Sequence, residues 1–324
     1  MNKEGVLDHK IIISIKRFYF KHTYVFSFLL LIIIAGAINK NFFSYSNIST
    51  LALQSTIKGI IALGMTLIII SGQIDLSVGS TCALVAGLGI VVLNSTNSPF
   101  IMLLFCIIFG TILGAINGLL VTKGKIAAFI VTLATMSAYR SIIVQIGQGG
   151  PFNVSPKMYK NFRMIAAGEV LGIPNLAIFF VVITIIVAFV MSKTKFGRYV
   201  YAVGSNENAS KLTGINTDRI KILCFSITGL LTGISAFLLS SRLTSITAPN
   251  AGMAFELDAI AAVAIGGTSM NGGRGRIAGT FLGVIMLQMI EGILIAAKIP
   301  PFLTGLVKGI IIIIAVLFQS KKDN

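Results

Sequence analysis

A single carboxylate interrupts a long apolar stretch near the start of the chain. Residues 64–80 form an apolar run, a polar break with Ser71, Gln73 and Asp75, and a second apolar run. Hydroxyl, amide and carboxylate groups can hydrogen bond to a polar solute, but Asp75 can also cap the helix that starts at Leu76. A charge between two membrane helices needs water, a partner or a function. The break is the first candidate site, and we expect it at the cytoplasmic end of a helical hairpin, where water can reach Asp75.

Further ionisable residues lie inside apolar runs. Arg140 is costly in lipid and should face protein, water or a carboxylate, so we expect it in a pathway or gate. Glu291 and Lys308 lie toward the same end of the last two runs, and we predict a structural ion pair between them. Lys58 can either extend to the membrane surface or line a path, and the sequence leaves this open.

A second break follows a short apolar run at residues 258–268. It contains Gly266 and Gly267, and then Arg274 and Arg276. The run is too short to cross a membrane alone, so we expect a broken or half-inserted helix. The two arginines anchor the cytoplasmic side or contact a cytoplasmic partner.

The sequence lacks the motifs and residues that several kinds of chemistry require. No string has the spacing of a phosphate-binding loop, and Gly273–Ala278 fits a dinucleotide fingerprint without the strand–helix–strand unit that it needs. The two histidines, His9 and His22, lie near the N-terminus, so we expect no histidine-based metal site and no activated nucleophile in the core. We therefore predict no catalytic residue, no metal, no cofactor in this chain, and no enzymatic activity.

The composition indicates a membrane protein. Hydrophobic residues make up 55% of the 324 residues and charged residues 11%, whereas soluble domains have about a quarter charged. The three cysteines lie in apolar runs and are predicted to be small packing residues. We expect an all-α bundle with about ten transmembrane spans, near residues 21–38, 50–70, 77–93, 99–121, 126–146, 174–191, 222–240, 258–268, 277–297 and 302–318.

The basic residues orient these spans. The net charge of +16 does not indicate nucleic-acid binding, because Lys and Arg lie in short connections without a basic groove. Seventeen of them fall in segments predicted to be inside and six outside, with three in spans, which places both termini in the cytoplasm. The predicted parts are a cytoplasmic segment at 1–20, a transmembrane domain in contact with lipid at 21–318, and a cytoplasmic tail at 319–324.

Glycines recur four residues apart within several spans. The clearest sets are Gly110, Gly114 and Gly118, and then Gly229 and Gly233. Such stripes let helices approach closely. We expect packing within one subunit, with a subunit interface as the alternative.

The longest inside connection, residues 192–221, contains the signals of one short helix. Asn206 or Ser205 can cap it, Glu207 favours its first turn and pairs with Lys211 four residues on, and Gly214 can end it. A helix this short needs a surface, and Ala209, Leu212 and Ile215 give it an apolar edge. That edge packs on the protein's own membrane ends or inserts into a cleft of a cytoplasmic partner.

Two strings carry a resemblance to a known family. Residues 64–80, with Ile-Asp-Leu-Ser-Val-Gly-Ser at their centre, and residues 264–280 resemble the ribose-type sugar permeases of ATP-binding cassette importers, within a superfamily that includes branched-chain amino acid permeases. Residues 204–214 resemble the cytoplasmic loop of that family. The resemblance implies a homodimeric subunit of the cytoplasmic membrane that works with an extracytoplasmic sugar-binding protein and a separate ATPase, which uses ATP and Mg²⁺.

The resemblance also assigns roles to the candidate residues. It implies a sugar path at Ser71, Gln73, Asp75 and Arg140, and contact with the ATPase at Asn206, Glu207, Ala209, Lys211, Leu212 and Gly214. Two alternatives stay open: a permease for another small polar solute, such as an amino acid or a furanose-like signal, and an ion-coupled secondary carrier.

Overall fold

The computed structural model describes residues 23–38 and 41–300, and then 303, 305–307, 309–310 and 313. Its main apolar helices are α2 (Thr23–Ile38), α3 (Tyr45–Ile70), α4 (Val78–Thr96), α5 (Pro99–Thr122), α6 (Ala128–Ile146), α8 (Asn175–Lys193), α11 (Thr217–Leu243), α12 (Phe255–Ile265) and α13 (Ile277–Ala296). Seven of these, all except α2 and α12, are long and apolar enough to cross a membrane. A multi-pass helical membrane protein is therefore confirmed.

Capping side chains set helix starts that the apolar pattern missed. Helix α3 begins at Tyr45 rather than near 50, because the Ser44 hydroxyl accepts from the Asn47 amide. Helix α11 begins at Thr217 rather than near 222, because Asn216 Oδ1 accepts from the Arg219 amide. Helix α12 is short, as predicted. The segments 1–20 and 319–324, and most of the span expected at 302–318, lie outside the described residues.

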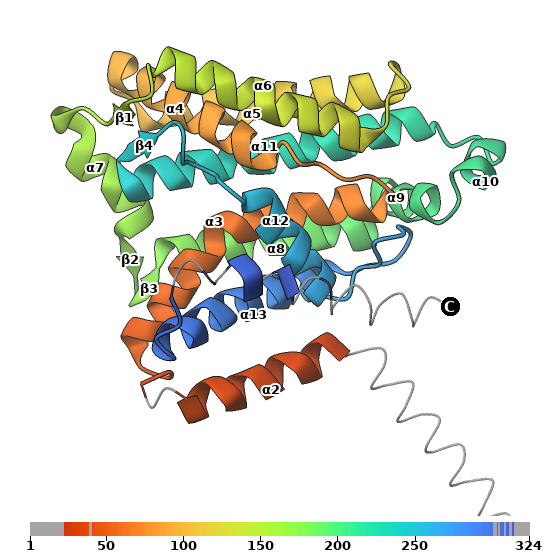
Figure 1. Ribbon diagram of the computed structural model, residues 1–324. Helices are drawn as coiled ribbons and strands as arrows, with labels where there is room; N and C mark the ends of the chain where they lie inside the picture. The colour runs from red at the N-terminus through yellow and green to blue at the C-terminus, as the bar shows by residue number, and fades with distance from the viewer. Residues whose placement is uncertain are drawn as a thin grey trace, which may run out of the picture.

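The connections at the two ends contain further elements. Helices α7 (Pro156–Ala167), α9 (Lys195–Ser205) and α10 (Glu207–Leu212) are too polar or too short to be spans. Strand β1 (Pro151–Asn153) pairs antiparallel with β4 (Ser245–Thr247), and β2 (Glu169–Val170) pairs with β3 (Ile173–Pro174). Figure 1 shows α7 and the strands at one end of the molecule, the α7 end, and α9 and α10 at the opposite α10 end.

Helix α11 lies at the centre of the bundle and packs on α3, α4 and α5. Its Gly229 and Gly233 lie against the backbone of α5, where a side chain would collide with the carbonyl oxygens of Gly110 and Cys106. The prediction that these glycine stripes pack inside one chain is confirmed. Helix α13 packs on α3 and α12 on one side of this centre, and α2 covers α13 (Figure 1).

Two irregular connections return into the bundle. Residues 71–77 leave α3 at the α10 end and run back to the start of α4, and the segment after β4 returns from the α7 end to the start of α12 (Figure 1). Their ends meet, because a side chain at Gly79 or Gly252 would collide with the carbonyl oxygen of the other. The first break was expected to stay at the cytoplasmic end of a hairpin, and that expectation is wrong.

Candidate functional site

Asp75 lies in the first returning segment and is buried. Its Oδ1 accepts from the Ser77 amide at 2.8 Å and from the Ser77 hydroxyl at 2.6 Å, and Asn117 Nδ2 donates to that hydroxyl at 2.8 Å. The prediction that Asp75 caps a helix starting at Leu76 is wrong, because α4 starts at Val78 and its N-cap is Ser77; the Asp75 carboxylate instead fixes Ser77 in place. The expectation that water reaches Asp75 at a hairpin end is wrong, because the segment turns back at Gly72 into the protein.

The other polar residues of this break differ in their surroundings. Ser71 is buried and donates to the Ile68 carbonyl at 2.7 Å. Gln73 is partly exposed and lines a hollow of about 620 Å³ at the α10 end, together with residues of the α5–α6 connection and with Glu207, Lys211, Asp218 and Lys221. Of the four residues predicted to line a path, Gln73 alone is in the lining of this hollow.

Arg140 holds the second returning segment in place. Its Nη1 donates to the carbonyl oxygens of Ala248 at 2.9 Å and Ala251 at 2.5 Å. These carbonyls lie in an irregular stretch between β4 and α12, where no helix satisfies them. Arg140 therefore faces protein, as its cost in lipid requires.

A cluster of charges continues from Arg140 across α12. Glu256 interacts electrostatically with Arg140 and with Asp258. Lys58 Nζ lies 2.6 Å from Asp258 Oδ2 and 3.4 Å from Glu291 Oε1. These five residues, Arg140, Glu256, Asp258, Lys58 and Glu291, are called the charged row below.

Sequence reasoning found the row only in part. It paired Glu291 with Lys308, which lies outside the described residues, whereas the structure places Glu291 beside Lys58. It assigned no role to Glu256 or Asp258. The signal was available: both acids lie in the first turn of a short helix, and Lys58 lies near the middle of α3.

The short helix in the long connection forms as predicted. Helix α10 begins after Asn206, whose Oδ1 accepts from the Ala209 amide at 2.9 Å, and Gly214 follows it with a φ of +82°. Glu207 Oε1 lies 2.9 Å from Lys211 Nζ. The apolar edge is divided: Ile215 packs on the core, whereas Ala209 is exposed and the Leu212 side chain is 90% exposed.

An ion pair ties α10 to the bundle. Glu207 Oε2 lies 2.7 Å from Lys221 Nζ at the start of α11. The hydrogen bond from Lys221, together with a second one from Lys211, lowers the pKa of Glu207 to about 2, against the opposing effect of partial burial. Glu207 is thus ionised at any physiological pH and keeps α10 next to α11.

The second break, between α12 and α13, lies at the α10 end, where it contacts α9 and the end of α3. The Gly273 amide donates to the Ile70 carbonyl at 2.9 Å, and the Tyr201 hydroxyl of α9 donates to the Gly275 carbonyl at 2.9 Å. A side chain at Gly204 of α9 would collide with Ile70 O. We call this contact of α9, the end of α3 and the second break the glycine junction.

The predicted residues of the second break surround the glycine junction. Gly266 packs on the backbone of Gly279 in α13, and Gly267 has a φ of +81°. The Arg274 carbonyl accepts from the Ser269 amide at 2.9 Å, and Arg276 directly precedes α13. The break is therefore an ordered loop between α12 and α13.

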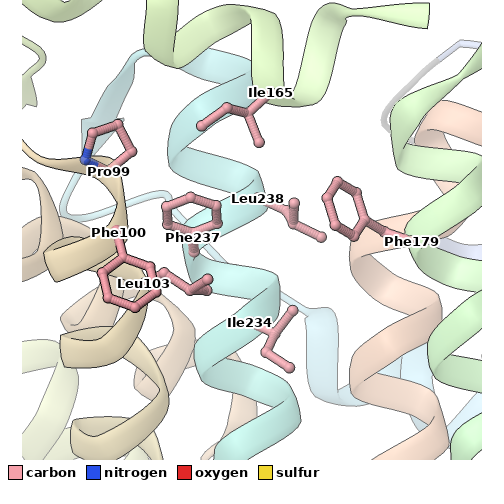
Figure 2. Close-up of a pocket in the computed structure, with 8 residues that line it drawn as sticks. All are labelled: Pro99, Phe100, Leu103, Ile165, Phe179, Ile234, Phe237 and Leu238. Carbon is pink, nitrogen blue, oxygen red and sulfur yellow. The ribbon is translucent and has the colours of Figure 1, made fainter. Parts of the chain in front are cut away.

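The flank between α5 and α8 is apolar. Figure 2 shows a hollow of about 250 Å³ over α11, with side chains from α5, α7 and α8 around it. Its lining is Pro99, Phe100, Leu103, Ile165, Phe179, Ile234, Phe237 and Leu238. Such a surface matches the acyl chains of lipid.

No metal site is present among the residues that the structure describes, since no group of three His, Cys, Asp or Glu side chains is placed to hold an ion. Cys82, Cys106 and Cys224 are free and buried, in agreement with a packing role.

Comparisons with known proteins place the chain among permeases. A family model described as the permease component of branched-chain amino acid transport systems matches residues 47–316. The ribose import permease of Bacillus subtilis is 43% identical over 91% of this chain and 91% of its own length. The ribose import permease of Escherichia coli K12 is 35% identical over 91% of this chain and 92% of its own length. The xylose transport system permease of the same strain is 32% identical over 86% of this chain and 86% of its own length. No solved structure gives a significant match.

Proposed function

The chain belongs to the permease family of branched-chain amino acid transport systems, and we propose that it is the membrane subunit of an ATP-binding cassette importer for a pentose such as ribose. The 43% identity to a ribose import permease over nearly the full length of both chains carries this proposal. A transport family is also consistent with a non-enzymatic chain. The relatives named for ribose and xylose favour a sugar over the amino-acid and signal alternatives.

The proposed topology has ten spans and both termini in the cytoplasm. The seven long apolar helices, with α2, α12 and the apolar residues 302–318, make up the ten. The excess of basic residues in alternate connections supports this orientation. The α10 end then faces the cytoplasm, and the α7 end faces outward.

A separate ATPase, using ATP and Mg²⁺, drives transport through α10. The 90% exposed Leu212 and the exposed Ala209 are available for a cleft in that partner. The Glu207–Lys221 pair ties α10 to α11, and the glycine junction ties α9 to the end of α3 and to the second break. A push on α10 and α9 is therefore passed to residues 71–77, one of the two segments that meet inside the bundle. A binding protein delivers sugar at the α7 end, and two copies of the chain form the transporter.

The sugar leaves by the hollow at the α10 end. Gln73 offers an amide there, and the neighbouring charged side chains keep the hollow wet. Arg140 shapes the path by holding residues 248–251, while Ser71 and Asp75 support the backbone of the break. Arg274 and Arg276 lie on the cytoplasmic side, where they anchor the second break or touch the ATPase.

Reconstitution in proteoliposomes tests the function. With its ATPase and binding protein, the chain should import radiolabelled ribose only when ATP is present, and unlabelled ribose or xylose should compete better than leucine. Uptake by the chain alone, driven by a proton or sodium gradient, would support the secondary-carrier alternative instead. ATP-dependent uptake in which leucine outcompetes both sugars would overturn the sugar assignment.

A double variant tests the coupling role of α10. Glu207→Lys with Leu212→Arg should abolish binding of the ATPase to the chain and ribose uptake. The control, Leu171→Arg, changes a 97% exposed leucine at the α7 end and should leave ATPase binding unchanged. Normal ATPase binding by the double variant would disprove the assignment.

A further inference from the structure

We infer that the charged row lines a water-filled part of the sugar path and binds sugar hydroxyl groups. The inference rests on the proposed function and adds a binding surface to it. From the sequence, Lys58 was left open as a path residue, and Glu256, Asp258 and Glu291 were not expected in the path.

Exposure of the row is the first argument. The side chains of Lys58 and Glu291 are 21% and 17% exposed, although both lie within spans. Ionised groups within spans face a bundle interior or a water-filled cavity rather than acyl chains.

The backbone around the row is the second argument. Both returning segments end beside it, at Gly79 and Gly252, and Glu256 Oε2 lies close to Gly79. Irregular backbone at membrane depth is found only where protein or water satisfies it. Arg140 satisfies two carbonyl groups of the second segment, and water in a path supplies bonds to the rest.

The third argument is the chemistry that the row offers. Arg140 and Lys58 can donate hydrogen bonds, and the partly exposed carboxylates of Glu256 and Glu291 can accept them. The buried Asp258 carboxylate holds the Lys58 ammonium in place at 2.6 Å. The hydroxyl groups of a sugar do both. The Phe255 ring, whose centroid lies 6.0 Å from Lys58 Nζ, adds an apolar face of the kind that packs against a sugar ring.

Cysteine labelling tests the inference in the assembled transporter. Leu257, next to Glu256 and Asp258 on α12, is 53% exposed, and Ile185, within α8, is 62% exposed. The variants Leu257→Cys and Ile185→Cys are labelled in membrane vesicles with a charged methanethiosulfonate, with and without ribose and the binding protein. The wild-type chain gives the background, because its three cysteines are buried.

Leu257→Cys should react at least about tenfold faster than Ile185→Cys, since thiolate forms in water and not among acyl chains, and ribose should slow it. Equal rates at the two positions would overturn the water-filled path. Fast labelling that ribose leaves unchanged would overturn the sugar contact. If Leu257→Cys fails to assemble, Met253→Cys, at a 71% exposed residue before α12, replaces it.

Ribose uptake by the wild-type transporter distinguishes a failure of the charged-row inference from a failure of the proposed function. When uptake is normal and labelling is slow, the row is wrongly assigned and the function stands. When neither ribose nor xylose is taken up, the proposed function itself fails.

Discussion

The charged row and the apolar hollow lie in two regions built from the same kind of apolar helices. Around the hollow, α5 and α11 are continuous helices that pack through glycine stripes, and every lining side chain is apolar. Around the row, α12 is short and irregular segments replace helical turns. Continuous helices satisfy their own backbone and can face lipid, whereas interrupted ones need polar partners, and the five side chains of the charged row lie beside the interrupted ones.

The largest expected effect comes from removing Lys58 from the charged row. Lys58→Met takes away the cation that lies 2.6 Å from Asp258, and because the Asp258 side chain is only 5% exposed, this loss costs about 3–5 kcal/mol. Thermal unfolding in lipid nanodiscs measures it. The triple variant Lys58→Met, Asp258→Asn, Glu291→Gln should recover most of the stability without recovering ribose uptake, and an unchanged melting temperature for Lys58→Met would contradict the account.

Placing the same charge in the two regions sharpens the contrast. Ile185→Asp puts a carboxylate on a lipid-facing side of α8, where insertion costs about 2.5–3.5 kcal/mol. Leu257→Asp puts it beside the row, where water should reduce the cost to below about 1 kcal/mol. The amount of folded protein in membranes gives the comparison, and equal losses would show that both sides face the same medium.

The glycine junction should be sensitive to a single methyl group. Gly204→Ala forces a side chain against Ile70 O, and overpacking of this kind costs about 1–3 kcal/mol. Ribose uptake should fall further than stability, because the junction links α9 to both breaks. The control is Gly292→Ala in α13, where the nearest atom would be 4.0 Å away and no loss is expected. Normal uptake by Gly204→Ala would exclude the junction from coupling.

The sequence predicted most elements correctly and located the sites less well. Long apolar runs gave the spans, and the caps at Asn206 and Gly214 gave α10, because these signals are local. The return of residues 71–77 into the bundle was missed, since it depends on packing between Gly79 and Gly252, about 170 residues apart in the chain. The contacts of Lys58 with Asp258 and Glu291 in the charged row were missed for the same reason, because α3, α12 and α13 meet only in the folded protein.

The smallest expected effect is the weakening of the Glu207–Lys221 ion pair, and with it the docking of α10 on α11, at acidic pH. The folded pKa of Glu207, about 2, lies below its ordinary value of 4.5, so the pair stabilises docking of α10 above pH 4.5 and is lost as the pH falls through about 2. Because Glu207 is about a third exposed, solvent screening limits the effect to about 1 kcal/mol or less. Proteolysis of residues 204–216 between pH 5 and pH 3 should accelerate in the wild type, with a smaller pH dependence in Glu207→Gln. Equal pH dependence in both would remove Glu207 from the explanation.

The difference between the two regions can be observed directly by electron cryomicroscopy of the assembled transporter in nanodiscs with ribose bound. The account predicts density for water and sugar along Arg140, Glu256, Asp258, Lys58 and Glu291, and acyl-chain density against Phe237 and Ile234. Acyl chains packed along the charged row, with sugar elsewhere, would contradict it.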